Sequence, residues 1–546
     1  MRVRQIAIVR HHWRLLALVL LFLSGVDSAR ANVYATDIKF NGSTNNAAVL
    51  PSNPVAISYI LNEPASGGLC LQILSGATVV WTNAVAAGAA GATVGSNCVI
   101  WGGTNQAGQN APVGVCQVSI TAAAKGHPAW TNITDDSASF FVGDPTGIAV
   151  NKNTNSPYLG RVFVGNAPPP QTTPIGVYKF NADGSPADEG SLSQTYPWSG
   201  GLFSPWKIAV AQDDTVYIND WSQGGLVIAF DETISTTYVT VLDISNYPYP
   251  SALLSGPFVT GGGLNTQVWM ADANTNGLSK GVVRWDVTAD GTVAAGDTGA
   301  VAVKISPSGL DLSAYDVAVD ALSNIYVVQC LDGFCDPSDF HQMPRLFAFP
   351  PYAGQPVLTT NWSVASLDYS LENAVGVAVD PTGQWVAVAV EGYGGQDVLQ
   401  LQNGAVNVYR ASDGNLVTRL GAGTNHAMLD AAWDLAGNLY ATDLNASVWR
   451  AYSPPGTNQA TTVAVPIIQV YDSFLQPLLT PTASPAPPAW RLAFTLQGQA
   501  NIAYTIESST NLLSWTAVAT NYDIVSLRTI TVPASDAACF FRAVAP

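Results

Sequence analysis

The chain has 546 residues, of which 11% are charged, and its formal net charge at pH 7 is −17. An average soluble domain is about 25% charged, so this sequence is not a charge-rich disordered protein. The acidic balance also argues against nucleic acid and anionic lipid as partners, because both would be repelled. The length suits two or three domains.

Residues 1–31 have the pattern of a signal peptide. A basic start precedes the apolar run 15–23, and Ala29-Arg30-Ala31 fits a small-x-small cleavage site. The run is shorter than the about 20 residues that span a bilayer, although an uncleaved anchor is the alternative. Cleavage would remove five arginines and one aspartate and leave a net charge of −21. We therefore expect a secreted, periplasmic or cell-surface protein with no membrane span in the mature chain.

Residues 32–142 predict a small β-sandwich, because alternating apolar segments are separated by glycine and proline turns. The run 99–121 contains Trp101, an Asn-x-x-Gly turn, Pro-x-Gly and an outgoing strand. It resembles the signature hairpin of the Ig-like domain first known in the flagellar hook-capping protein FlgD. Gly102-Gly103 stands where that family has Asp-Gly, and Cys116 where it usually has Tyr. The resemblance implies a spacer or presentation module.

Five of the six cysteines are candidates for disulfide bonds in an exported protein. Cys330 and Cys335 flank a short, turn-prone spacer, which predicts a local disulfide. Cys98 and Cys116 lie symmetrically about a turn, so a cross-strand disulfide between them is a second hypothesis, and Cys70 could compete for either partner.

Residues 143–470 contain a repeated unit with an apolar inner run, a turn and a second run that carries an aromatic residue. The inner runs recur about every 50 to 60 residues, the period of a propeller blade with long loops. They begin at Gly147, Lys207, Phe258, Asp316, Gly376 and Asp430. A ring of such units covers both apolar faces of each sheet. The sequence therefore predicts an all-β protein with a six-bladed β-propeller, and seven blades is the alternative.

The units resemble NHL-type propeller blades. Blade five reads Val-Ala-Val-Asp-Pro-Thr-Gly-Gln-Trp-Val-Ala-Val over 377–388, and blade six reads Ala-Trp-Asp-Leu-Ala-Gly-Asn-Leu-Tyr-Ala-Thr-Asp over 432–443. Either residues 139–142 or the runs within 461–471 could close the ring. Pro466 between those later runs suggests an edge strand, where a missing amide costs little.

Residues 471–488 are rich in proline and predict a stiff linker. Residues 489–546 predict a small C-terminal β-sandwich. The run 504–515 and the strand Phe540-Phe-Arg542 resemble the C-terminal β-module common in large exported bacterial proteins. That family has no established chemistry, and attachment or export is the usual expectation.

Asp272, Asn274 and Asn276 place oxygen side chains at alternate positions before Gly277, as at the opening of a calcium loop. The twelfth position is Val283 instead of the expected glutamate, and turn formation by Asn and Gly explains the pattern better. No organic cofactor is expected, and calcium stays open as a ligand.

Several other side chains suggest chemistry. Aspartates recur after the first strands at Asp320, Asp380 and Asp434, and turn capping explains them better than a ring-shaped site. His426 could act as a base in the channel, but the sequence shows it no partner. Aromatic residues at loops could stack on sugars or peptides, or fill space between blades. The candidate ligand-binding residues are Trp198, Trp206, Trp221 and Tyr249.

These features favour an exported, non-catalytic binding or scaffold protein whose propeller loops hold a polysaccharide or a surface protein. One alternative is a propeller lyase or hydrolase with a metal in the central channel, which would need several convergent polar side chains at one mouth. The other is a structural component of the cell envelope.

Overall fold

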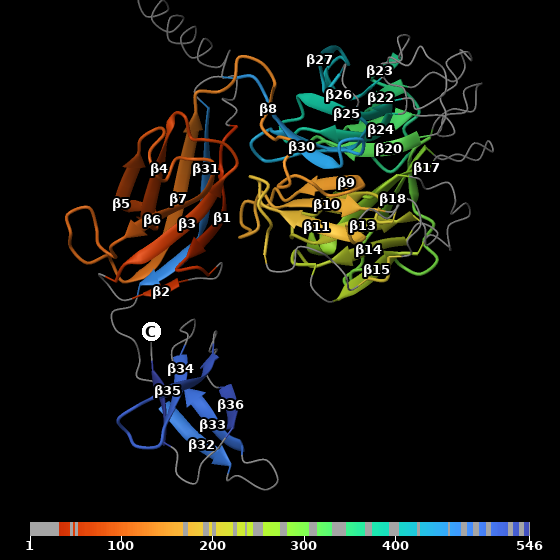
Figure 1. Cartoon of the computed structure of the whole chain (residues 1–546). Helices are drawn as coiled ribbons and strands as arrows, with labels where there is room; N and C mark the ends of the chain where they lie inside the picture. The colour runs from red at the N-terminus through yellow and green to blue at the C-terminus, as the bar shows by residue number, and fades with distance from the viewer. Residues whose placement is uncertain are drawn as a thin grey trace, which may run out of the picture.

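The structure is a computed structural model of the whole chain, coloured along its length in Figure 1. It describes residues 32–43, 47–49, 53–167, 173–188, 196–198, 204–221, 226–234, 237–243, 255–272, 281–304, 314–329, 345–365, 374–392, 403–422, 426–456, 459–470, 478–483, 491–497, 504–521, 528–533 and 540–544. Within these ranges we find no helix long and apolar enough to cross a membrane. The predicted signal peptide and the Cys330–Cys335 pair lie outside them.

Six antiparallel sheets form the ring of a six-bladed β-propeller, as predicted. Blade one contains β9 (Pro145–Val150), β10 (Val162–Asn166) and β11 (Gly176–Phe180). Blade two contains β12 (Ile208–Val210), β13 (Val216–Asp220), β14 (Leu226–Phe230) and β15 (Tyr238–Leu242). Blade three contains β16 (Phe258–Thr260), β17 (Gln267–Asp272), β18 (Gly281–Asp286) and β19 (Ala300–Val303), with a short 3-10 helix at Gly263–Asn265.

The second half of the ring repeats this plan. Blade four contains β20 (Ala314–Val319), β21 (Ile325–Gln329), β22 (Arg345–Phe349) and β23 (Trp362–Ala365). Blade five contains β24 (Ala374–Val379), β25 (Trp385–Gly392), β26 (Asn403–Arg410) and β27 (Leu416–Leu420). Blade six contains β28 (Met428–Trp433), β29 (Leu439–Asp443), β30 (Val448–Ser453) and, as its fourth strand, β8 (Thr131–Asn132).

The ring is closed by the segment that precedes blade one. Strand β8 pairs with the end of β30 through Tyr452 and Asn132, and Phe141 forms a bridge with Val448 at the other end of that strand. Of the two predicted closing segments, residues 139–142 therefore lie beside blade six, whereas residues 461–470 pair with a strand of the sandwich.

The sandwich has two sheets, and one of them takes a strand from beyond the propeller. The first sheet contains β1 (Ala35–Phe40), β3 (Val55–Leu61) and β6 (Gly95–Trp101). The second has the order β2 (Ala47–Val49), β31 (Gln459–Val470), β7 (Gly114–Ala124), β4 (Gly68–Ser75) and β5 (Thr78–Val85). Strand β31 pairs antiparallel with β7 and parallel with β2.

Strand β31 corrects the expected range of the propeller, because residues 459–470 belong to the sandwich sheet. Among the described strands only β7 pairs with β31 around Pro466, because β2 pairs with residues 468–470, so the proline lies on a locally unpaired side of the strand, as the sequence predicts. The pairing with β7 shifts register between Val465 and Ile468, and this irregularity accommodates the amide that proline lacks.

The predicted Cys98–Cys116 disulfide is wrong, because both residues and Cys70 are free thiols. Cys98 lies on β6 and is exposed, whereas Cys116 lies on β7, in the opposite sheet, and is buried. The turn between these strands therefore connects the two sheets instead of forming a hairpin. Burial raises the pKa of the Cys116 thiol, which keeps it protonated and unreactive.

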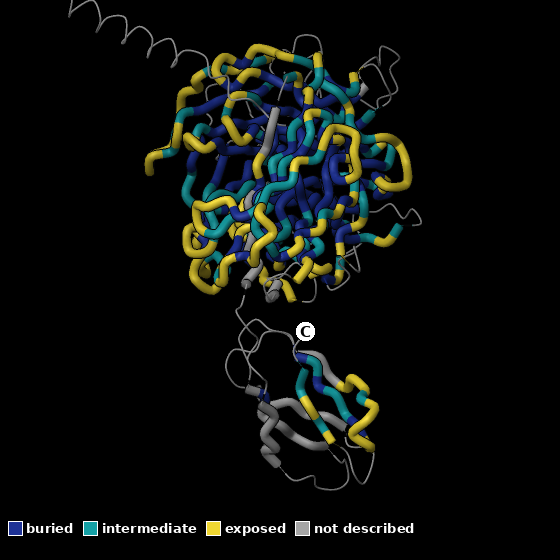
Figure 2. Tube along the Cα trace, turned by 90° about the vertical axis from the view of Figure 1, so that its left-hand side faces the viewer, coloured by how far each residue is buried: buried dark blue, intermediate teal, exposed yellow. Residues whose placement is uncertain are grey.

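Burial follows the two architectures (Figure 2). In the sandwich, β3 and β4 alternate between buried and half-buried positions, as expected of sheets with one face on the core. In the propeller, β9, β13 and β29 are buried at every position, because each sheet is covered on both faces by its neighbours. Full burial of each Val, Leu or Ile stabilises the fold by about 1.5–3 kcal/mol.

The C-terminal part contains two three-stranded antiparallel sheets, drawn below the sandwich in Figure 1. One contains β32 (Leu478–Ala483), β33 (Arg491–Gln497) and β36 (Arg528–Pro533), and the other β35 (Thr516–Asn521), β34 (Tyr504–Ser509) and β37 (Phe540–Val544). Strand β32 falls within the predicted linker, so the module begins earlier than expected. The Arg542 guanidinium lies 4.2 Å from the centre of the Trp515 ring and 2.7 Å from Glu507 Oε2.

Candidate functional site

Residues from five of the six blades meet at one buried point, which places that point on the propeller axis. Lys207 immediately precedes β12, Asp316 lies in β20 and Asp430 lies in β28. All three side chains are more than nine-tenths buried. They occupy the same position of the repeat, the first residue of the predicted inner run, and together we call them the axial cluster.

Lys207 is fully engaged within the axial cluster. Its Nζ donates to the carbonyl oxygens of Val375 (2.8 Å) and Leu429 (2.7 Å) and to Asp430 Oδ1 (2.8 Å). These three acceptors use all three hydrogens of the ammonium group. The other oxygen of Asp430 accepts from the backbone N–H of Ile148 at 2.9 Å, so this carboxylate is tied to blades one and two together.

Asp316 is the less well compensated carboxylate of the axial cluster. Its Oδ2 lies 3.8 Å from Lys207 Nζ, too far for a hydrogen bond, and accepts from the backbone N–H of Val377 at 2.9 Å. Burial raises the pKa of Asp316 to about 7, although the nearby Lys207 ammonium lowers it in part. Burial also raises the pKa of Asp430, against the same ammonium. With both carboxylates ionised, the cluster carries one net negative charge.

Two glycines make room for these side chains. A Cβ on Gly147 would lie 2.5 Å from the carbonyl oxygen of Trp206 and 2.7 Å from Lys207 Cα. A Cβ on Gly376 would lie 3.0 Å from Lys207 Nζ and 3.1 Å from Asp430 Oδ1. Glycine therefore occupies the repeat position in blades one and five because the space there is already filled.

A cavity of about 700 Å³ continues from the axial cluster along the propeller axis. Its walls include small apolar residues of the inner strands, such as Ala209, Val379 and Ala432, and its rim includes turn residues such as Asn153 and Gln212. The charged residues that line it are Lys152, Lys207, Asp316, Asp320, Asp380 and Asp430.

Apolar side chains fill the opposite side of the axial cluster in the described part of the propeller. Trp206, Val375 and Leu429, each just before a residue of the repeat position, form a buried apolar cluster with Trp221 and Leu444 packed against it. The cavity residues follow the axial cluster in sequence, whereas these apolar residues precede it. Within the part of the chain that the structure describes, the channel is therefore blind and opens on the face formed by the turns between first and second strands.

The recurrent aspartates at that face cap turns, which confirms the structural interpretation. Asp320 Oδ1 accepts from the backbone N–H groups of Leu322 and Asn324. Asp380 Oδ1 accepts from the backbone N–H groups of Gln384 and Trp385, each at 2.6 Å. These oxygens hold the turns in place and are not directed at a shared ligand.

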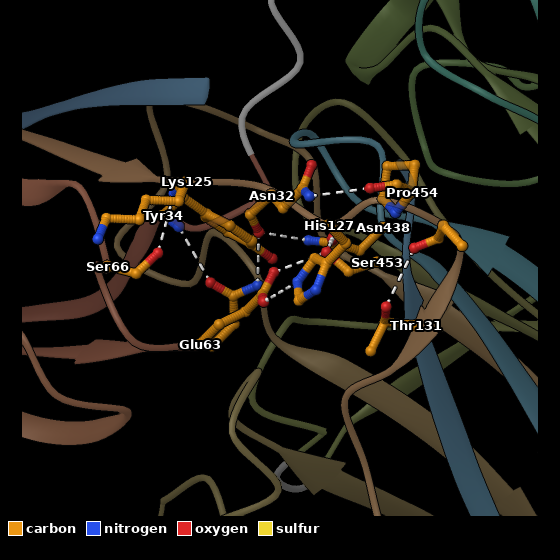
Figure 3. A network of polar contacts seen from close by, with 12 residues as sticks. Asn32, Tyr34, Glu63, Ser66, Lys125, His127, Thr131, Asn438, Ser453 and Pro454 are labelled. Atoms are coloured by element: carbon orange, nitrogen blue, oxygen red, sulfur yellow. Dashed lines mark hydrogen bonds and ion pairs between the residues drawn. The ribbon is translucent and has the colours of Figure 1, made fainter. Parts of the chain in front are cut away.

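The sandwich docks beside the channel mouth through a polar network (Figure 3). Glu63 Oε2 lies 2.8 Å from His127 Nε2, and Glu63 Oε1 accepts from Ser453 Oγ at 2.7 Å. Asn438, in the first turn of blade six, donates to the carbonyl oxygen of Asn32 at 2.8 Å. Leu159, Ala182 and Ala436 of the propeller join the sandwich core. The contacts fix the sandwich on the face where the channel opens.

The four aromatic residues predicted to bind ligand differ in their surroundings. Trp206 is 4% exposed and belongs to the apolar cluster next to the axial cluster, so it is not the exposed ring at a loop that the sequence suggests. Trp198 and Trp221 are half-buried, with the Trp198 ring 4.6 Å from that of Tyr196, and Tyr249 lies outside the described residues.

The predicted calcium loop falls largely outside the described residues. Asp272 ends β17, opposite Gly281, and Asn274 and Asn276 lie in the part that is not described. Among the residues that the structure does describe, no group of three or more His, Cys, Asp or Glu side chains could hold a metal ion.

His426 has the partner that the sequence did not reveal. Its Nδ1 lies 2.5 Å from Oδ2 of the buried Asp443, and Arg450 Nε donates to the same oxygen at 2.8 Å. Arg450 in turn contacts Asp136, which follows the closing strand β8. This group ties the closing segment to blade six.

The axial cluster was also missed as a site. Its signal was present in the sequence: three blades carry a charged residue at a repeat position where two others carry glycine.

Comparison with known proteins gives similarity of fold only. No protein-family model and no curated protein matches this sequence. A solved glucose dehydrogenase is 11% identical, with a TM-score of 0.38 over 60% of this chain and 100% of its own. The soluble aldose sugar dehydrogenase from Escherichia coli, in its apo-form, is 11% identical, with a TM-score of 0.35 over 61% and 99%. PhoX from Pseudomonas fluorescens, in complex with vanadate, is 9% identical, with a TM-score of 0.29 over 78% and 88%. These values carry no argument about activity.

The raised pKa of Asp316 predicts that ionising this residue costs stability. Between about pH 4 and pH 7 the folded state holds a proton on Asp316 that the unfolded chain has released, so the free energy of unfolding falls as pH rises through this window. Asp316→Asn keeps an acceptor for the backbone N–H of Val377. The variant should be more stable than the unmodified protein at pH 8, and its free energy of unfolding should fall less between pH 5 and pH 8. Urea midpoints at the two pH values test this, and an unchanged decline in the variant would contradict it.

Proposed function

We propose that this protein is a non-catalytic binding protein and that its ligand enters the blind channel of the propeller. The observation that carries the proposal is the cavity of about 700 Å³, closed at the axial cluster and open at one face. Small-molecule sites usually measure about 300–1,000 Å³ and combine apolar walls with a few placed polar groups. This channel has both features.

The engagement of the charged groups favours binding over catalysis. Lys207 has no hydrogen left to donate, and Asp320 and Asp380 hold their turns. A metal-dependent lyase or hydrolase would need a cation beside these carboxylates. At the axis that place is taken by the Lys207 ammonium, 2.8 Å from Asp430 and 3.8 Å from Asp316.

The channel also narrows the expected ligand. A long polysaccharide does not thread a channel that is closed at one end, so we propose a small polar molecule or the end of a chain. The sandwich beside the mouth would then act as the presentation module that the sequence suggests. Export by the signal peptide remains part of this proposal and rests on the pattern of residues 1–31.

Filling the channel should abolish ligand binding without unfolding the protein. We expect Ala209→Phe or Ala432→Phe to remove the rise in melting temperature that a bound ligand causes. The probes are glucose, glucosamine, glucuronate and methylguanidinium at millimolar concentration. Val417→Phe, on the exposed outer strand β27, is the control.

Two outcomes would contradict the proposal. One is a shift that survives in both channel variants while circular dichroism shows them folded, and the other is no shift with any probe. Conversion of a probe into a product, detected by mass spectrometry, would favour the enzyme instead.

A further inference from the structure

We infer that the ligand of the channel is a small organic cation, which binds the carboxylate of Asp316 through an ammonium or guanidinium group. This inference rests on the proposed function, because it names the ligand class of the same site. Three features of the axial cluster and its cavity carry it.

The first feature is the difference between the hydrogen bonds that the two axial carboxylates, Asp430 and Asp316, receive. Asp430 receives a hydrogen bond from Lys207 at 2.8 Å and another from the backbone of Ile148. Asp316 receives none from Lys207, and the hydrogen bonds that the described residues give it come from the backbone amides of Val377 and Val317. Since all three hydrogens of the ammonium are used elsewhere, Lys207 cannot turn to Asp316 without losing a partner. A negative charge at Asp316 therefore shares one ammonium group, at 3.8 Å, with the more closely paired Asp430.

The second feature is the charge of the whole cavity. Four aspartates line it against two lysines, and Lys152 is an exposed residue of the rim. Asp320 and Asp380 are bound to turn amides, so Asp316 is the lining carboxylate with the fewest compensating donors. Attraction between charges is stronger in such a poorly solvated site than in water. The negative charge of the cavity therefore favours binding of a cation and opposes binding of an anion.

The third feature is the spacing of the oxygens, which suits an organic cation better than a metal ion. Calcium takes six to eight oxygen ligands, and magnesium needs near-ideal octahedral geometry. Here the Lys207 ammonium contacts both Asp316 and Asp430, so the two carboxylates do not share a vacant position. A guanidinium needs only one carboxylate, which it can hold through two parallel hydrogen bonds.

Methylguanidinium and N-methylurea provide a direct test, because they have nearly the same shape and only the first is charged. Calorimetric or NMR titration of the full chain at pH 8 should show methylguanidinium binding about tenfold or more tightly than N-methylurea. Binding should weaken at pH 6, because guanidinium keeps its charge whereas Asp316 takes up a proton.

Asp316→Asn should lower the affinity for methylguanidinium by about tenfold or more and remove its dependence on pH. Asp413→Asn makes the same change at an exposed turn of blade five and should leave binding unaltered. Equal binding of the two probes, or full binding by Asp316→Asn, would overturn the inference. If the inference fails in this way but N-methylurea binds the unmodified protein and does not bind Ala209→Phe, the channel still binds a small ligand and the proposed function is supported. If neither probe binds, the inference fails, and the sugars tested above decide the function.

Discussion

Replacing Lys207 with methionine is expected to destabilise the protein by about 3–5 kcal/mol at pH 8, the usual cost of removing one partner of a buried ion pair. The substitution keeps much of the side-chain volume but leaves Asp430 and Asp316 without their only axial cation. It also leaves the carbonyl oxygens of Val375 and Leu429 without their donor. Urea denaturation followed by tryptophan fluorescence measures the loss.

The loss should depend on pH and on Asp430. At pH 5 it should be smaller, because burial favours the protonated form of both aspartates once the ammonium is gone. The double variant Lys207→Met/Asp430→Asn should recover part of the lost stability, since it removes a buried charge together with its partner. A single variant that loses under 1 kcal/mol at pH 8 would show that the axial cluster does not hold the blades together.

Ending the chain before β31 is expected to prevent folding of the sandwich, whereas ending it after β31 is not. Strand β31 pairs with β7 from Gln459–Ala124 to Val470–Gly114, and Val463 is buried in the sandwich core. Without it, β7 becomes an unpaired edge and apolar residues of both sheets meet water, a state that promotes aggregation. We therefore expect a protein of residues 32–457 to be insoluble, and one of residues 32–471 to be soluble and folded.

The two truncated proteins share the absence of the C-terminal module, so their difference reports on β31 alone. Soluble yield, size-exclusion elution and the cooperativity of thermal unfolding provide the comparison. Equal behaviour of the two proteins would mean that the sandwich does not need its strand from beyond the propeller. Insolubility of both would instead indicate that the module stabilises the rest.

The sequence predicts those features of the fold that repeat along it. The inner runs at Lys207, Asp316 and Asp430 identify blades because each blade must bury the same positions. The return of residues 459–470 to the sandwich could not be predicted in this way, because an apolar strand does not specify which sheet will accept it. The prediction of a hairpin after Cys98 was wrong for a similar reason, since a hairpin and a connection between two sheets have the same turn residues.

The candidate site was less predictable than the fold. Asp443 lies seventeen positions after His426, on the following strand, so their contact depends on how β28 and β29 align. The axial cluster joins residues more than 200 positions apart, as Lys207 and Asp430 show. Pairing at such distances is set by closure of the ring, which no local pattern encodes.

The placement of β31 imposes an order on biosynthesis. Strands β3, β4 and β7 leave the ribosome first, and the strand that completes their sheet follows only after all six blades have been made. At about 5–20 residues per second, the nascent sheet would wait roughly 20–70 s with β7 unpaired on one side. That interval is the period in which a holding chaperone would have the most exposed backbone to protect.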